Sequence, residues 1–92
     1  MRFEWDDEKA IGNVEKHGVS FGEATEVFYD SNSLVGDDTE HSGNESRFFI
    51  LGYSMKRLLF VVFAERYQDV IRIISARKPT ATERRLYEEG KR

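Results

Sequence analysis

Residues 47–77 read RFFILGYSMKRLLFVVFAERYQDVIRIISAR, and this stretch decides the fold. It contains three runs rich in β-branched and aromatic residues, which predict strands at Arg47–Tyr53, Arg57–Ala64 and Val70–Ala76. The segments between these runs are three and five residues long, lengths that suit hairpins. The simplest arrangement is therefore an antiparallel meander.

The middle run is apolar at both alternating positions from Leu58 to Phe63. Such a run is typical of a strand that is covered on both faces. Upstream, Leu34-Val35 predicts a further short strand, and the polar, mostly acidic residues 37–46 predict a loop. Elements outside the three main strands must therefore pack on both faces of this central strand.

Helices are predicted on both sides of this region. Asp6 is expected to cap a first helix that stops at Gly18, and Ser20–Glu23 has the pattern of a capping box for a second helix through about Phe28. A third helix opens at Thr80, directly after the only proline. Its apolar face is thin, so we expect it to dock loosely or to be held by a partner.

Length and composition limit the class of protein. The 92 residues form one domain, residues 1–92, with a single core. There is no cysteine, which excludes disulfides and thiolate metal sites. We expect a cytoplasmic protein with no membrane partner, because the sequence has no signal-peptide pattern and no run long enough to span a bilayer. No nucleotide-cofactor motif is present, and we expect no cofactor.

Charge is divided unevenly along the chain. Residues 1–55 carry four Lys/Arg and twelve Asp/Glu, a net −8, whereas residues 56–92 carry ten and five, a net +5, which sum to −3. A basic half within an acidic chain predicts a surface for a polyanion, since Lys and Arg neutralise phosphates. It equally predicts a docking surface for an acidic protein partner.

Two arginines of the last strand are candidate anion ligands. Simple alternation places Arg72 on one face with Val70, Ile74 and Ala76. Either Arg72 reaches an acidic side chain on a neighbouring element, or it lines a face where an anion binds. By the same alternation Arg77 falls on the opposite face of the sheet, but it lies at the strand end, where its side chain can turn to the edge of the face that carries Arg72.

The histidines give further candidates. His17 follows Lys16 at a helix C-terminus, where it can hold a phosphate, pass a proton, or simply bond the terminal carbonyls. His41 lies among acidic residues, but the spacing fixes no metal geometry. If the substrate is RNA, the 2′-hydroxyl can attack the phosphorus without a metal, with His17 or Glu45 moving protons and Tyr87 stacking or donating one. These residues alone do not favour RNA cleavage over nucleic-acid binding without cleavage.

Several whole phrases resemble the BrnT family of bacterial toxins. They include Lys16-His17-Gly18-Val19 near the start and Arg72-Ile73-Ile74-Ser75-Ala76-Arg77 near the end, in the family's order. The resemblance covers nearly the whole chain; the Lys78-Pro79 pair departs from the usual pattern. It implies an α+β, RelE-like fold: an antiparallel sheet of three to four strands, two N-terminal helices packed on one face, and a C-terminal helix.

The resemblance also implies a function and a site. The function is that of the toxin of a type II toxin–antitoxin pair, an endoribonuclease that inhibits translation without a metal. Its partner is a BrnA-like, ribbon-helix-helix antitoxin that neutralises it and alone carries operator-DNA binding. The implied site residues are Lys16, His17, Glu45, Arg57, Arg72 and Arg77. The alternative is a non-catalytic interaction module that docks an acidic or amphipathic partner segment.

Overall fold

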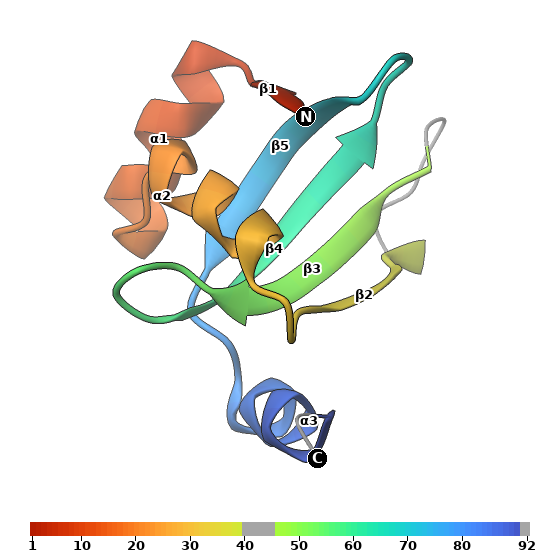
Figure 1. The fold of residues 1–92 in the computed structure, drawn as a ribbon. Helices are drawn as coiled ribbons and strands as arrows, with labels where there is room; N and C mark the ends of the chain where they lie inside the picture. The colour runs from red at the N-terminus through yellow and green to blue at the C-terminus, as the bar shows by residue number, and fades with distance from the viewer. Residues whose placement is uncertain (40–45, 91–92) are drawn as a thin grey trace.

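The computed structural model describes residues 1–39 and 46–90. In these ranges the chain forms β1 (Arg2–Glu4), α1 (Asp7–His17), α2 (Phe21–Glu26), η1 (Val27–Tyr29), β2 (Leu34–Asp37), β3 (Phe48–Tyr53), β4 (Leu58–Glu65), β5 (Val70–Arg77) and α3 (Ala81–Gly90). The strands form one sheet in the order β1-β5-β4-β3-β2 (Figure 1). Within those ranges, every helix is too short or too polar to cross a membrane.

The predicted meander is confirmed. The strands β2 to β5 pair antiparallel, and the bounds of β3, β4 and β5 agree with the prediction to within one residue. The predicted strand count of three to four is wrong, because β1 adds a fifth strand that runs parallel to β5. This strand has only three residues and pairs with the far end of the chain, so no local periodicity indicates it.

The helices α1 and α2 cover one face of the sheet, as predicted (Figure 1). The core on this face contains Phe21, Ala24 and Val27 from the helical layer. Its sheet residues are Ile50, Leu59, Val61, Phe63, Ile71, Ile73 and Ala76. Burying these apolar side chains between the two layers supplies the main stabilisation of the fold.

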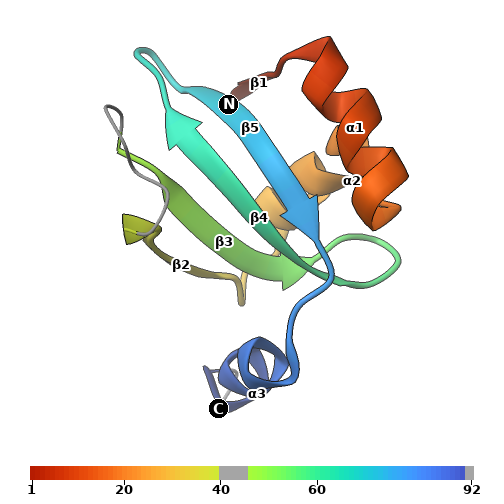
Figure 2. The same cartoon turned by 180° about the vertical axis from the view of Figure 1, so that it is seen from behind.

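The helix α3 docks on the opposite face, where it covers only part of the sheet (Figures 1 and 2). Its anchor is Tyr87, which is 2% exposed and packs with Leu51 and Leu58. The Tyr87 hydroxyl donates a hydrogen bond of 2.6 Å to Asp30 Oδ2. The predicted role of Tyr87 in stacking on RNA or donating a proton is therefore wrong, because its ring lies in the core.

An irregularity in β5 changes which side chains share a face. The register runs from Phe60↔Arg77 to Val62↔Ser75, and then shifts to Phe63↔Ile73, which leaves Ile74 as the extra residue of a bulge. Arg77 and Ser75 consequently lie on the same face as Arg72. The prediction that Arg72 and Arg77 lie on opposite faces of the sheet is wrong, since simple alternation does not account for a bulge. Ala76 likewise moves to the helix-covered face.

Candidate active site

A cavity of about 530 Å³ opens on the α3 side of the sheet, beside the C-terminal ends of α1 and β5. Its charged or titratable lining residues are Lys16, His17, Asp38, Arg47, Arg77 and Glu83. They come from α1, from the loop after β2, from the start of β3, from β5 and from α3. Three of the predicted site residues, Lys16, His17 and Arg77, therefore line one cavity.

The end of α1 positions Lys16 and His17. Asp6 caps the start of this helix by accepting a hydrogen bond of 2.9 Å from the Lys9 N–H, as predicted. Gly18 ends it with a left-handed conformation, φ 69° and ψ 23°, and its N–H bonds to the Val14 carbonyl. A side chain at position 18 would strain this backbone, so the turn that ends the helix at His17 depends on glycine.

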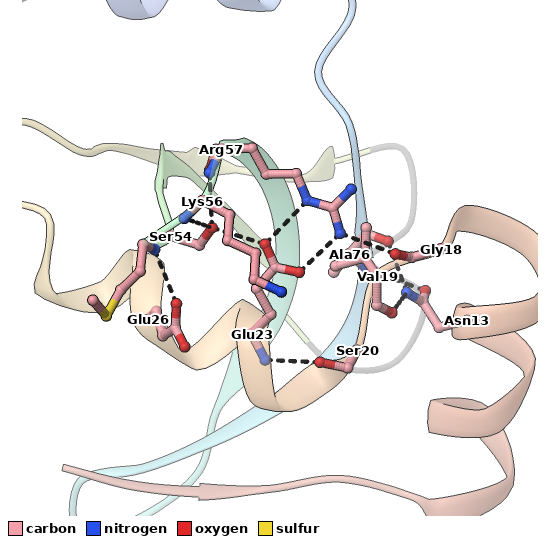
Figure 3. A network of polar contacts seen from close by, with 11 residues as sticks. Asn13, Gly18, Val19, Ser20, Glu23, Glu26, Ser54, Lys56, Arg57 and Ala76 are labelled. Atoms are coloured by element: carbon pink, nitrogen blue, oxygen red, sulfur yellow. Dashed lines mark hydrogen bonds and ion pairs between the residues drawn. The ribbon is translucent and has the colours of Figure 1, made fainter.

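Arg57 braces this turn from the β3–β4 hairpin (Figure 3). Its Nε and Nη2 donate to the Glu23 carboxylate at 3.0 and 2.8 Å, and Nη2 also donates to the Gly18 carbonyl at 2.9 Å. Ser54 Oγ donates to the same carboxylate at 2.8 Å. The hydrogen bonds from Arg57 hold the pKa of Glu23 below its ordinary value, despite partial burial. Arg57 does not line the cavity among the described residues.

The pattern at Ser20–Glu23 is only half a capping box. Ser20 Oγ accepts from the Glu23 N–H at 3.0 Å, as predicted. The Glu23 carboxylate, however, turns to Arg57. The box at Thr80 is complete, since Thr80 N donates to Glu83 Oε1 at 2.9 Å and Glu83 N donates to Thr80 Oγ1 at 3.1 Å.

Arg77 is held in one orientation by several contacts. Its Nη1 and Nη2 donate to the two oxygens of Glu83 at 2.9 and 3.0 Å, and Nη1 donates to the Lys78 carbonyl at 3.0 Å. The guanidinium carbon lies 4.2 Å from the ring centre of Phe60. Burial raises the pKa of Glu83, but hydrogen bonds from Arg77 and Thr80 outweigh it and leave the pKa below its ordinary value. Glu83 is thus ionised at neutral pH.

Arg72 lies on the same face but pairs elsewhere. Its Nη1 donates to Glu4 Oε2 at 3.0 Å, and Arg66 Nε lies 3.7 Å from the same oxygen. This result confirms the first alternative for Arg72, an acidic side chain on a neighbouring element. The parallel pairing of β1 with β5 sets Glu4 directly opposite Arg72. Arg72 does not line the cavity among the described residues.

Three charged cavity residues were not among the predicted site residues: Asp38, Arg47 and Glu83. Arg47 is half-buried, and its Nε is buried with no hydrogen-bond partner in the described part of the chain. The alternation of β3 contained the signal, because position 47 shares a face with Phe49 and Leu51. Glu83 was predicted to have only a structural role, because it belongs to the capping pattern that begins at Thr80. Glu45 and His41 lie outside the described residues.

A sequence model of the family described as "Ribonuclease toxin, BrnT, of type II toxin-antitoxin system" matches residues 5–83. The chain belongs to the BrnT family. This membership confirms the predicted family and, at the level of class, a ribonuclease toxin of a type II toxin–antitoxin system.

The crystal structure of the BrnT ribonuclease toxin from Brucella abortus has the same fold. It shares 22% sequence identity with this chain, with a TM-score of 0.68, over 87% of this chain and 97% of that one. This likeness supports the α+β architecture of the BrnT-family chain. No curated protein matches the sequence at a significant level.

Proposed function

We propose that the chain is a metal-independent endoribonuclease and that the cavity lined by Lys16, His17, Arg47 and Arg77 is its active site. The observation that carries this proposal is the convergence on one cavity of these four side chains, which come from α1, from the residue before β3 and from β5. A phosphodiester needs cationic hydrogen-bond donors to bind its charge and a titratable group to move a proton. The cavity supplies both kinds of group.

The chemistry is an intramolecular displacement. The ribose 2′-oxygen attacks the adjacent phosphorus, so that the O2′–P bond forms while the P–O5′ bond breaks. A base takes the 2′-hydroxyl proton, and an acid gives a proton to the leaving O5′. The products are a 2′,3′-cyclic phosphate and a free 5′-hydroxyl.

Each proposed residue has a role in this scheme. His17 transfers one proton, and Glu45, whose placement remains a prediction from the family pattern, transfers the other. Lys16, Arg47 and Arg77 stabilise the added negative charge of the phosphorane. Arg57 acts indirectly through the turn that it braces, because its guanidinium donates to Glu23 and to the Gly18 carbonyl. Arg72 pairs with Glu4 outside the cavity and takes no part in this scheme.

The proposed partner is a BrnA-like, ribbon-helix-helix antitoxin. It neutralises the toxin by covering the cavity, and operator DNA is bound only through it. Cleavage of RNA by the free toxin inhibits translation in the cytoplasm. The basic side chains of Lys16, Arg47 and Arg77 at the cavity offer a docking site for an acidic segment of this partner.

The test is an RNA cleavage assay with antitoxin-free protein in EDTA. The native protein is compared with Arg77→Ala and with Arg85→Ala, a matched loss of an exposed arginine on α3. Circular dichroism checks that each variant is folded. We expect cleavage by the native protein and by Arg85→Ala, with 2′,3′-cyclic phosphate ends, and no cleavage by Arg77→Ala.

Other outcomes decide against parts of the proposal. Equal activity of the two variants would remove Arg77 from the site. Cleavage that EDTA abolishes would refute metal independence. If RNA stays intact both alone and with added ribosomes, the chain is the non-catalytic interaction module.

A further inference from the structure

Asn13 is a polar residue buried between α1 and the sheet. Only 7% of it is exposed. Its Nδ2 donates to the Val19 carbonyl and to the Ala76 carbonyl, each at 2.8 Å, and its Oδ1 accepts from the Ala76 N–H at 3.2 Å (Figure 3). Both amide protons and the amide oxygen are therefore used. A buried amide with all its partners in place is costly to replace.

The contact with Ala76 takes the place of a neighbouring strand. The strand β1 pairs with β5 only over Val70–Arg72, so among residues 1–39 and 46–90 no strand lies beside the outer edge of β5 at Ala76. A single amide side chain donates to the Ala76 carbonyl and accepts from its N–H, as a strand backbone would. Asn13 thereby closes the sheet edge at the position before Arg77.

The third bond fixes the other side of the cavity. Val19 follows the turn that ends α1, and Asn13 lies one helical turn before Lys16 and His17. One side chain thus ties the helix end that carries Lys16 and His17 to the strand end that carries Arg77. These are the two groups of residues that meet at the cavity.

We propose that Asn13 is a positioning residue, which sets the distance between Lys16–His17 and Arg77 without touching RNA. The proposal rests on the proposed ribonuclease function. Arg57 braces the same turn through the Gly18 carbonyl, but its side-chain hydrogen bonds go to Glu23 and Gly18 and not to β5 in the described part of the chain. Asn13 links α1 directly to β5 through its hydrogen bonds to Ala76.

Replacing the amide by a carboxyl gives a pH-dependent test. In Asn13→Asp, an ionised carboxylate would face the Val19 and Ala76 carbonyl oxygens with no proton to donate. The protonated carboxyl regains one donor and one acceptor. Burial among carbonyl oxygens raises the pKa of the introduced carboxyl, so that lowering the pH restores part of the native geometry.

The experiment compares native protein, Asn13→Asp, Asn13→Ala and the control Asn32→Asp. Asn32 is exposed and lies outside the cavity, so Asn32→Asp makes the same chemical change but leaves the hydrogen bonds of Asn13 intact. We expect kcat for RNA cleavage, corrected for the folded fraction, to fall on the order of 100-fold in Asn13→Asp at pH 7.5, as for a misplaced catalytic group. We expect the ratio to the native value to recover toward pH 5.5. Asn13→Ala is expected to lose activity at every pH.

A second readout does not depend on cleavage. The imidazole proton resonance of His17, assigned with His17→Gln, is expected to move in folded Asn13→Asp and to stay in place in Asn32→Asp. If Asn13→Asp does not fold at pH 7.5, folded Asn13→Ala provides the same resonance test. Native activity and an unchanged His17 resonance in a folded Asn13 variant would overturn the proposal. A protein that never cleaves RNA, but whose His17 resonance moves, would refute the proposed function alone.

Discussion

The pair formed by Arg57 and Glu23 provides a test between bracing and catalysis. The resemblance to the family led to the prediction that Arg57 is a site residue, yet its guanidinium donates to Glu23 and to the carbonyl of Gly18, which follows His17. If Arg57 acts only as a brace, then Glu23→Gln should affect RNA cleavage in the same direction as Arg57→Ala. Both changes weaken the same support of the turn that ends α1.

The structure sets the size of the expected stability loss. The side chain of Glu23 is 11% exposed and that of Arg57 is 33% exposed, so the pair is partly screened by water. Hydrogen bonds to a charged group are worth about 1.5–3 kcal/mol when they form in such sites. Allowing for exposure, we expect Arg57→Ala to lower the free energy of unfolding by about 2 kcal/mol. Glu23→Gln keeps an acceptor oxygen and is expected to cost about half as much.

The assay is a double-mutant cycle. Urea unfolding and RNA cleavage are measured for the native protein, both single variants and the double variant. We expect the double variant to lose less stability than the sum of the single losses, because one contact is removed in all three. The bracing role is refuted if folded Arg57→Ala loses cleavage while Glu23→Gln keeps native activity, since Arg57 would then act on RNA itself.

Further predictions follow from the same contacts. The pKa of Glu23 lies below its ordinary value of 4.5, so the native protein should be more stable than Glu23→Gln, and this difference should be full above pH 4.5. The difference should disappear as the pH falls through the pKa of Glu23 in the folded state. Urea unfolding of both proteins between pH 7 and 3 measures it. Arg72→Ala is expected to cost about 0.2–1 kcal/mol of stability and to keep RNA cleavage, because its ion pair is solvent-exposed; loss of cleavage by the folded variant would contradict this. Tyr87→Phe is expected to cost about 1.5–3 kcal/mol in urea unfolding, because the Asp30 carboxylate loses a buried donor. Lys16→Ala should weaken RNA binding and reduce the salt slope of log K by about 0.7, and an unchanged slope would show that Lys16 does not meet a phosphate.

Local patterns predicted the regular parts of the fold and failed where distant segments meet. The bounds of β3, β4 and β5, and the caps at Asp6, Gly18 and Thr80, depend on neighbouring residues and could be predicted. The strand β1 and the bulge at Ile74 depend on pairing between segments far apart in the sequence. The same limit applies to the site. Lys16, His17 and Arg77 were predicted from their places at a helix end and a strand end and from the family phrases, whereas the pairing of Glu83 with Arg77 appears only in three dimensions.

The uneven charge of the two halves has a structural role within the fold. Acidic Glu4 and Glu23 belong to the first half, and their partners Arg72 and Arg57 belong to the second. The basic second half is thus partly neutralised by the acidic first half within the fold. Ion pairs of this kind join β1 to β5 and α2 to the β3–β4 hairpin.

It follows that the net +5 of residues 56–92 does not by itself mark the RNA surface. Of the basic residues that line the cavity, Lys16, His17 and Arg47 come from the acidic half and Arg77 comes from the basic half. A cationic site therefore arises where a few positive side chains converge within a chain that is acidic overall. The affinity of this site for a phosphate depends more on the geometry that Asn13 and Arg57 maintain than on the net charge of the segment that contributes each residue.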